Sequence, residues 1–204
     1  MPDIQITLTQ FIDFSVRQQG VSRVNYVRRI KQQPEYHPAW DFWKQLRDAL
    51  REMHSRKLST SVLDDLISSV HPKKRELYTQ AVAGYKNFLK KKEVAWFDPG
   101  KSHWSTEDLL VRTSPELGLL INGQPHLLKL YFKGHGETAT KRNIAVTLAM
   151  LSESQFERPF HSGIPSVMST AQSKLFTLES ALSDSDRIAL AADAQQFVFL
   201  WNQL

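Results

Sequence analysis

The stretch from Thr113 to Gly134, TSPELGLLINGQPHLLKLYFKG, contains two apolar runs that meet at Asn122-Gly123. An Asn-Gly pair between apolar runs is typical of a tight hairpin turn, because both residues tolerate a positive φ. A loop of two or of four residues gives the same register, with Leu117 opposite Leu128. The sequence therefore predicts a β-hairpin whose strand pairing is fixed by its turn.

The two faces of this predicted hairpin differ in polarity, because side chains alternate along each strand. The polar face carries Glu116 across from Lys129, and the same alternation places Ser114 across from Tyr131. The other face is predicted to be core, and it carries Leu117, Leu119, Ile121, Leu128, Leu130 and Phe132.

Two interpretations of the polar face stay open. In the first, Glu116 and Lys129 form a cross-strand ion pair on a solvated surface, which contributes at most about 1 kcal/mol. In the second, Glu116 binds a divalent metal ion, and Lys133 orients a nucleophilic water or binds a phosphate. Directly opposed side chains lie about 5 Å apart at Cβ, which is close enough for either arrangement.

The first 90 residues or so are predicted to be all-helical, and the rest of the chain is predicted to mix strands with helices. Thr7 and Gln10 have the spacing of a capping box at the start of the first helix. Apolar residues at three–four spacing mark the remaining helices. The predicted helices cover 7–20, 21–33, 37–57, 59–70, 71–92, 137–152 and 183–204, and the further strands cover 93–100, 164–170 and 173–180.

This element order predicts an α+β protein in two parts. Residues 1–70 form an N-terminal helical region, and residues 71–204 form a core with a mixed sheet and a C-terminal helix. The chain has 204 residues, 41% of them hydrophobic, which suffices for a sizeable core. It contains no cysteine and no secretory signal or membrane-spanning run is visible, so we expect a soluble cytoplasmic protein without a membrane partner.

The positive charge is concentrated in the first half of the chain. Residues 1–93 hold 17 Lys and Arg against 10 Asp and Glu, whereas residues 94–204 hold 9 against 11. Such asymmetry indicates either an anionic partner or a helical surface that happens to be basic. The candidates for nucleic-acid contact are Arg17, Arg23, Arg28, Arg29, Lys31, Lys129, Lys141 and Arg142.

Pro115-Glu116, then the hairpin, then Tyr131-Phe132-Lys133 resembles the signature of the restriction-endonuclease-like, or PD-(D/E)xK, superfamily. The resemblance covers roughly residues 72–180 and implies an α-β-β-β-α-β core. It implies that Glu116 is a metal ligand, that Lys133 is the motif lysine, and that Mg²⁺ or Mn²⁺ is the cofactor for phosphodiester hydrolysis.

The sequence departs from this signature at Tyr131, where the family has its second carboxylate. One carboxylate beside Lys129 and Lys133 makes a poor magnesium site, because the lysines compete for it. The sequence therefore leaves open a metal-dependent nuclease, a nucleic-acid-binding protein with a degenerate site, and a catalytically inactive scaffold or protein-interaction subunit. A phosphate site in the turn between Gly134 and Gly136 is a weaker alternative, and a protein partner or homo-oligomer cannot be read from the sequence.

Overall fold

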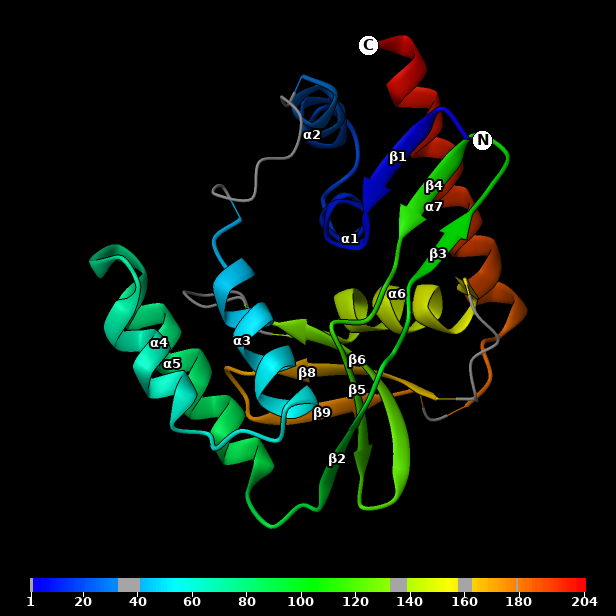
Figure 1. Ribbon diagram of the computed structural model, residues 1–204. Coiled ribbons are helices and arrows are strands. Elements are labelled where there is room, and N and C mark those ends of the chain that lie inside the picture. Colours follow the sequence, from blue (N-terminus) through cyan, green and yellow to red (C-terminus); the bar gives the residue numbers. More distant parts are fainter. Residues whose placement is uncertain (1, 33–40, 133–138, 158–162, 179) are drawn as a thin grey trace.

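The computed structural model describes residues 2–32, 41–132, 139–157, 163–178 and 180–204 (Figure 1). The helices are α1 (Leu8–Ser15), α2 (Val21–Lys31), α3 (Lys44–Ser55), α4 (Val62–Ser69), α5 (Pro72–Leu89), α6 (Lys141–Ser152) and α7 (Asp184–Gln203). The strands are β1 (Ile4–Thr7), β2 (Val94–Phe97), β3 (Ser102–Ser105), β4 (Leu109–Arg112), β5 (Leu117–Ile121), β6 (Gln124–Tyr131), β7 (Gln155–Phe156), β8 (Ile164–Ser169) and β9 (Lys174–Thr177).

The strands form two mixed sheets, so the predicted α+β class is confirmed. Sheet A has the order β1-β4-β3-β7, and sheet B has the order β2-β5-β6-β8-β9. One neighbouring pair in each sheet is parallel, β1 with β4 and β6 with β8. The parallel β6–β8 pair requires a crossover connection, and α6 lies in that connection as the sequence predicted.

The predicted hairpin is confirmed as β5–β6, with Leu117 paired to Leu128. Asn122 and Gly123 have φ values of 49° and 83°, which fits a two-residue turn with both central residues at positive φ. The Asn122 N–H also donates to the Glu93 carbonyl at 2.9 Å, and the Asn122 side chain accepts from the Glu93 N–H at 3.0 Å. These bonds attach the turn to the start of β2.

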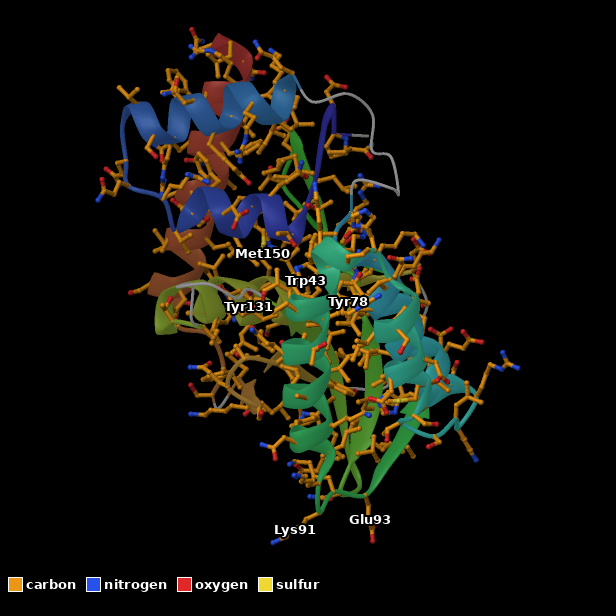
Figure 2. The ribbon with its side chains drawn as sticks, turned by 90° about the vertical axis from the view of Figure 1, so that its left-hand side faces the viewer. Trp43, Tyr78, Lys91, Glu93, Tyr131 and Met150 are labelled. Atoms are coloured by element: carbon orange, nitrogen blue, oxygen red, sulfur yellow. The ribbon has the colours of Figure 1, made fainter. Side chains whose placement is uncertain are left out.

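Helices α3, α4 and α5 cover one face of sheet B (Figure 1). All six side chains predicted to face the core from the hairpin are buried in this sheet B cluster. Aromatic rings continue the cluster, since Trp43 stacks on Tyr78 at a centroid distance of 5.3 Å and on Phe132 at 4.9 Å. Figure 2 shows Trp43 beside Tyr78.

Helix α6 lies between the two sheets and packs toward both (Figure 1). Ile144 and Leu148 face sheet B, where they form a cluster with Val167. Met150 and Leu151 belong instead to the sheet A cluster, which also contains buried residues of β1, α1, α2, β4 and α7. The face of sheet B opposite α3–α5 is therefore partly covered by a helix.

The all-helical prediction for the first 90 residues is wrong at its start. Ile4–Thr7 form a strand that pairs in parallel with β4, and their side chains alternate between buried and exposed. The capping box of Thr7 and Gln10 is confirmed and begins α1 directly after this strand. Four residues of period-two alternation are too short to stand out beside the helical pattern that follows.

A second correction concerns the predicted pairing of Ser114 with Tyr131, which requires the first hairpin strand to extend back through residues 113–116. Residues 113–116 instead link two strands in different sheets, because β4 ends at Arg112 and pairs with β3 and β1. The Ser114 side chain donates to the Ser102 carbonyl at 3.2 Å, and the pairing of β5 with β6 begins only at Leu117 with Leu128, so Ser114 and Tyr131 are not strand partners. Glu116 keeps its predicted place on the polar face, opposite Lys129, whereas Ser114 does not.

Residues 1–70 contribute to both hydrophobic clusters. Helices α1 and α2 pack into the sheet A cluster with α6 and α7, whereas α3 and α4 pack into the sheet B cluster with α5. The boundary predicted between residues 70 and 71 therefore passes through both clusters. Helix α3 begins at Lys44, later than the predicted start at His37, and residues 33–40 lie outside the described residues.

Candidate functional site

Glu116 lies just before β5, and both of its carboxylate oxygens are engaged. Lys129 Nζ donates to Oε1 and forms an ion pair with it, while the Leu130 N–H donates to Oε2 at 2.8 Å. The side chains of Glu116 and Lys129 are only 10% and 17% exposed. The cross-strand ion pair predicted from alternation is therefore present, but it is largely buried and not on a solvated surface.

The described residues near Glu116 do not fit a divalent-metal centre. Such a centre needs several converging oxygen ligands, and this carboxylate is already bound by a cation and an N–H donor. Asp98, Glu107 and Asp108, which could have supplied substitute ligands, are exposed. Across the residues that the structure describes, no three His, Cys, Asp or Glu side chains gather into a possible metal site.

Of the other residues of the predicted signature, the structure describes Tyr131 but not Lys133. Tyr131 ends β6, is half-buried, and packs against the cluster of Ile144, Leu148 and Val167. Lys133 lies outside the described residues, as does the turn between Gly134 and Gly136.

Arg23, one of the predicted nucleic-acid contacts, is buried. It is 2% exposed, and its guanidinium donates to Asp193 Oδ1 at 2.8 Å, to the Ser15 carbonyl at 2.9 Å and to Gln196 Oε1. This arginine joins α1, α2 and α7 and does not face a partner. The sequence does contain a signal for this, since Arg23 shares the three–four spacing of the buried Tyr26, Val27 and Ile30.

The other predicted cations of this region do reach the surface. Arg28 and Arg29 are exposed on α2, and the guanidinium of Arg29 lies 5.0 Å from the Tyr26 ring centre. Arg17 covers the same ring at 4.4 Å. Lys31 donates to the Trp201 carbonyl at 2.8 Å.

Lys141 and Arg142 begin α6, and their side chains are not among those described.

A basic groove with charged walls lies along β2, and the sequence did not predict it. Its larger part, about 820 Å³, is lined by Arg51, Lys101 and Arg112 together with Trp96. Its smaller part, about 520 Å³, is lined by Lys57 and Lys92 and by the same Trp96. We call these two adjoining cavities the β2 groove. Two carboxylates, Asp98 and Glu157, also line it.

The β2 groove could not be predicted from the sequence because its cations come from five separate places in the chain. Arg51 lies on α3, Lys57 just after it, and Lys92 just after α5. Lys101 precedes β3 and Arg112 ends β4. The one local signal is the three-residue spacing of Arg51 and His54, which places both on the side of α3 that faces β2.

Two histidines lie beside hydroxyl groups, and His126 is buried whereas His54 is half-buried. His54 Nε2 lies 2.7 Å from the Tyr85 hydroxyl, in the smaller part of the β2 groove, and burial lowers the pKa of His54 to about 4. Burial also raises the pKa of Tyr85. His126 Nδ1 lies 2.9 Å from Ser166 Oγ inside sheet B, where burial lowers the pKa of His126. Both rings are expected to be neutral near pH 7. No sequence motif predicts the contact of either histidine with its hydroxyl group.

Comparison of the chain with protein-family models finds no match, and comparison with curated proteins finds none either. Within the described part of the chain, no helix has the length and apolar character needed to cross a membrane.

Proposed function

We propose that this chain binds nucleic acid through a nuclease-like core without cleaving it. The strand order β2-β5-β6-β8, with α5 on one face and α6 in the crossover between parallel strands, supports the layout that the PD-(D/E)xK resemblance implies. The positively charged first half of the chain supports an anionic partner.

The observation that carries the proposal is the state of Glu116. In an active nuclease of this kind, the matching carboxylate would hold a metal ion, yet here it accepts from Lys129 and from the Leu130 N–H. Moving Glu116 to a metal would leave a largely buried ammonium without its partner, which is costly. The same contacts make a good structural ion pair, so the fold is retained while the chemistry is lost.

A combined binding and cleavage assay tests this proposal. We expect the full chain to shift labelled DNA or RNA at low salt, with affinity that falls steeply as salt increases. We expect no cleavage with Mg²⁺ or Mn²⁺. Cleavage that disappears in both Glu116→Ala and Lys133→Ala would overturn the non-catalytic part, and no binding of duplex or single strand at low salt would overturn the nucleic-acid part.

A second candidate function, a protein-interaction subunit that keeps the fold, is favoured by the outer face of α7. Ile188 and Phe199 are 69% and 62% exposed, and their spacing of 11 residues places them on one side of the helix. We expect Ile188→Ser with Phe199→Ser to abolish association with a protein partner if this function holds. Unchanged association behaviour, measured by sedimentation over a concentration series with and without cell extract, would remove this candidate.

A further inference from the structure

We propose that the β2 groove binds an unpaired stretch of nucleic acid, with one base stacked on Trp96 and the phosphates held by the surrounding cations. This proposal rests on the proposed nucleic-acid function and adds to it the location and the kind of strand. Five cations against two carboxylates give the groove a positive field. A positively charged groove that contains an aromatic side chain is the usual arrangement for binding a single strand.

Arg51 differs from the other lysines and arginines of residues 44–56, because those cations form ion pairs within the chain. Lys44 pairs with Asp48, Arg47 with Asp41, and Arg56 with Glu52. Within the described ranges, by contrast, no hydrogen bond or ion pair engages the side chain of Arg51.

The same is true of Lys57, Lys101 and Arg112 over the residues that the structure describes. Four of the five cations of the β2 groove are therefore open to phosphate oxygens.

Trp96 is positioned to act as the stacking surface because it lines both parts of the groove. It lies on β2, an edge strand of sheet B, and pairs with Leu119. Its ring is half-buried, with one side packed against the sheet B cluster. A base that stacks on the remaining side would extend an already ordered apolar surface, whatever its sequence.

The β2 groove is separate from the nuclease-like signature. Trp96 faces the same side of sheet B as Leu119, which is the side covered by α3–α5. Glu116 points to the opposite side, where it meets Lys129. Binding in the groove would therefore not depend on Glu116.

The shape of the groove favours an unpaired strand over a duplex. The two cavities are hollowed into the surface around Trp96, so a base must leave its own stack to reach the ring. Unstacking costs least where the strand is already single. Cavities of about 820 Å³ and 520 Å³ have the size of small-molecule sites, which suits one or a few nucleotides.

Fluorescence anisotropy with the full chain tests the proposal, using a labelled oligothymidylate, a duplex of the same length and a labelled thymidine monophosphate as probes. We expect the oligothymidylate to bind most tightly. Lys101→Glu and Arg112→Glu should each weaken its affinity about 10-fold or more and reduce the log–log salt slope. Lys73→Glu is the charge-matched control, because Lys73 is exposed at the opposite end of α5 from Lys92.

A second pair of variants removes one lysine each without straining the backbone, so that a change in binding is not caused by unfolding. Lys57 and Lys91 both have left-handed backbone, with φ of 54° and 60°, so glycine fits either position without strain. Lys57→Gly removes a groove cation, whereas Lys91→Gly removes one that projects from the end of the molecule (Figure 2). We expect only Lys57→Gly to weaken oligothymidylate binding, by several-fold.

The possible results separate the two proposals. If the wild-type chain binds neither oligothymidylate nor duplex at low salt, the nucleic-acid function itself fails. If it binds them but the groove variants behave like Lys73→Glu and Lys91→Gly, the groove assignment is wrong while the function stands. Duplex binding tighter than single-strand binding overturns the unpaired strand, and monophosphate binding as tight as oligothymidylate binding overturns a nucleic-acid chain as the ligand.

Discussion

At the scale of single residues, the pairing of Glu116 with Lys129 decides between a catalytic and a structural carboxylate. Removing one partner of a buried ion pair leaves an uncompensated charge, so we expect Glu116→Ala to lower the free energy of unfolding by about 2–4 kcal/mol. A carboxylate kept for catalysis would behave in the opposite way, since replacing active-site residues commonly stabilises a protein. Denaturant unfolding measures the difference.

The matched control is the double variant Glu116→Leu with Lys129→Met, which removes both charges together. An apolar pair of similar volume often replaces a buried ion pair without loss of stability. We therefore expect the double variant to recover most of the lost free energy of unfolding. A double variant as unstable as Glu116→Ala would contradict the structural role of the pair.

His54 makes stability depend on pH in a defined direction. Its pKa is about 4 in the folded protein and 6.5 in its ordinary state, so between these values the unfolded chain binds more protons than the folded one. The free energy of unfolding should therefore fall as the pH drops from about 6.5 to about 4, by at most about 3 kcal/mol. His126 contributes in the same direction.

Thermal unfolding of the wild type and of His54→Gln from pH 7 to pH 4 isolates this contribution, because glutamine keeps a polar partner for Tyr85 but does not titrate. We expect the two curves to converge as the pH falls. Parallel curves would mean that folding does not lower the pKa of His54.

Alternation along two strands sufficed to predict the contact of Glu116 with Lys129, because that contact is local to a hairpin of fixed register. The burial of this pair could not be predicted in the same way, since it depends on neighbours outside the hairpin. Arg23 shows the same limit, because Asp193, its ion-pair partner, lies 170 residues away in the chain. Local patterns specify which face a side chain occupies but not what later covers that face.

At the scale of elements, Gly84 fixes the distance between α5 and the turn after β8. A Cβ atom at this position would lie 1.8 Å from the Thr170 carbonyl oxygen, so the helix can approach the turn only because residue 84 has no side chain. Alanine normally stabilises a helix interior relative to glycine by about 1 kcal/mol. Here we expect Gly84→Ala to destabilise the protein by about 2–4 kcal/mol.

The control for this helix is Ala83→Gly, at the neighbouring exposed position of α5. It should cost only the difference in helix propensity, about 1 kcal/mol. By denaturant unfolding, we therefore expect the protein to be more stable with alanine than with glycine at residue 83, and more stable with glycine than with alanine at residue 84. A stabilising Gly84→Ala would show that α5 is farther from the turn than the structure places it.

The elements most accurately predicted from the sequence carry their own boundary signals. The β5–β6 turn has Asn122-Gly123, and α7 begins with a Ser183 cap whose side chain accepts from the Asp186 N–H. The elements that were missed, β1 and the break at 113–116, depend on partners elsewhere. β1 becomes a strand by pairing with β4, more than 100 residues later, and β4 leaves the hairpin to do so.

At the scale of the whole molecule, the chain order does not follow the two hydrophobic clusters. The sheet A cluster takes residues from β1 to α2, from β4 and α6 in the middle, and from α7 at the end. The sheet B cluster takes its residues from α3 to β8. A prediction made from local composition cannot anticipate this interleaving, because each segment has the same pattern whichever cluster it joins.

This interleaving predicts how the fragment 71–204 should behave alone. Without residues 1–70, the fragment would expose Leu109, Val111 and Phe197, which are fully buried in the whole chain. It would also lose α3 and α4 from the sheet B cluster. Since exposed apolar area of this kind removes much of the driving force for folding, we expect the fragment to lack a cooperative thermal transition by circular dichroism. The whole chain should unfold cooperatively under the same conditions. A fragment that unfolds as sharply as the whole chain would instead establish an independent core beginning near residue 71, with the helices of residues 1–70 as an appendage.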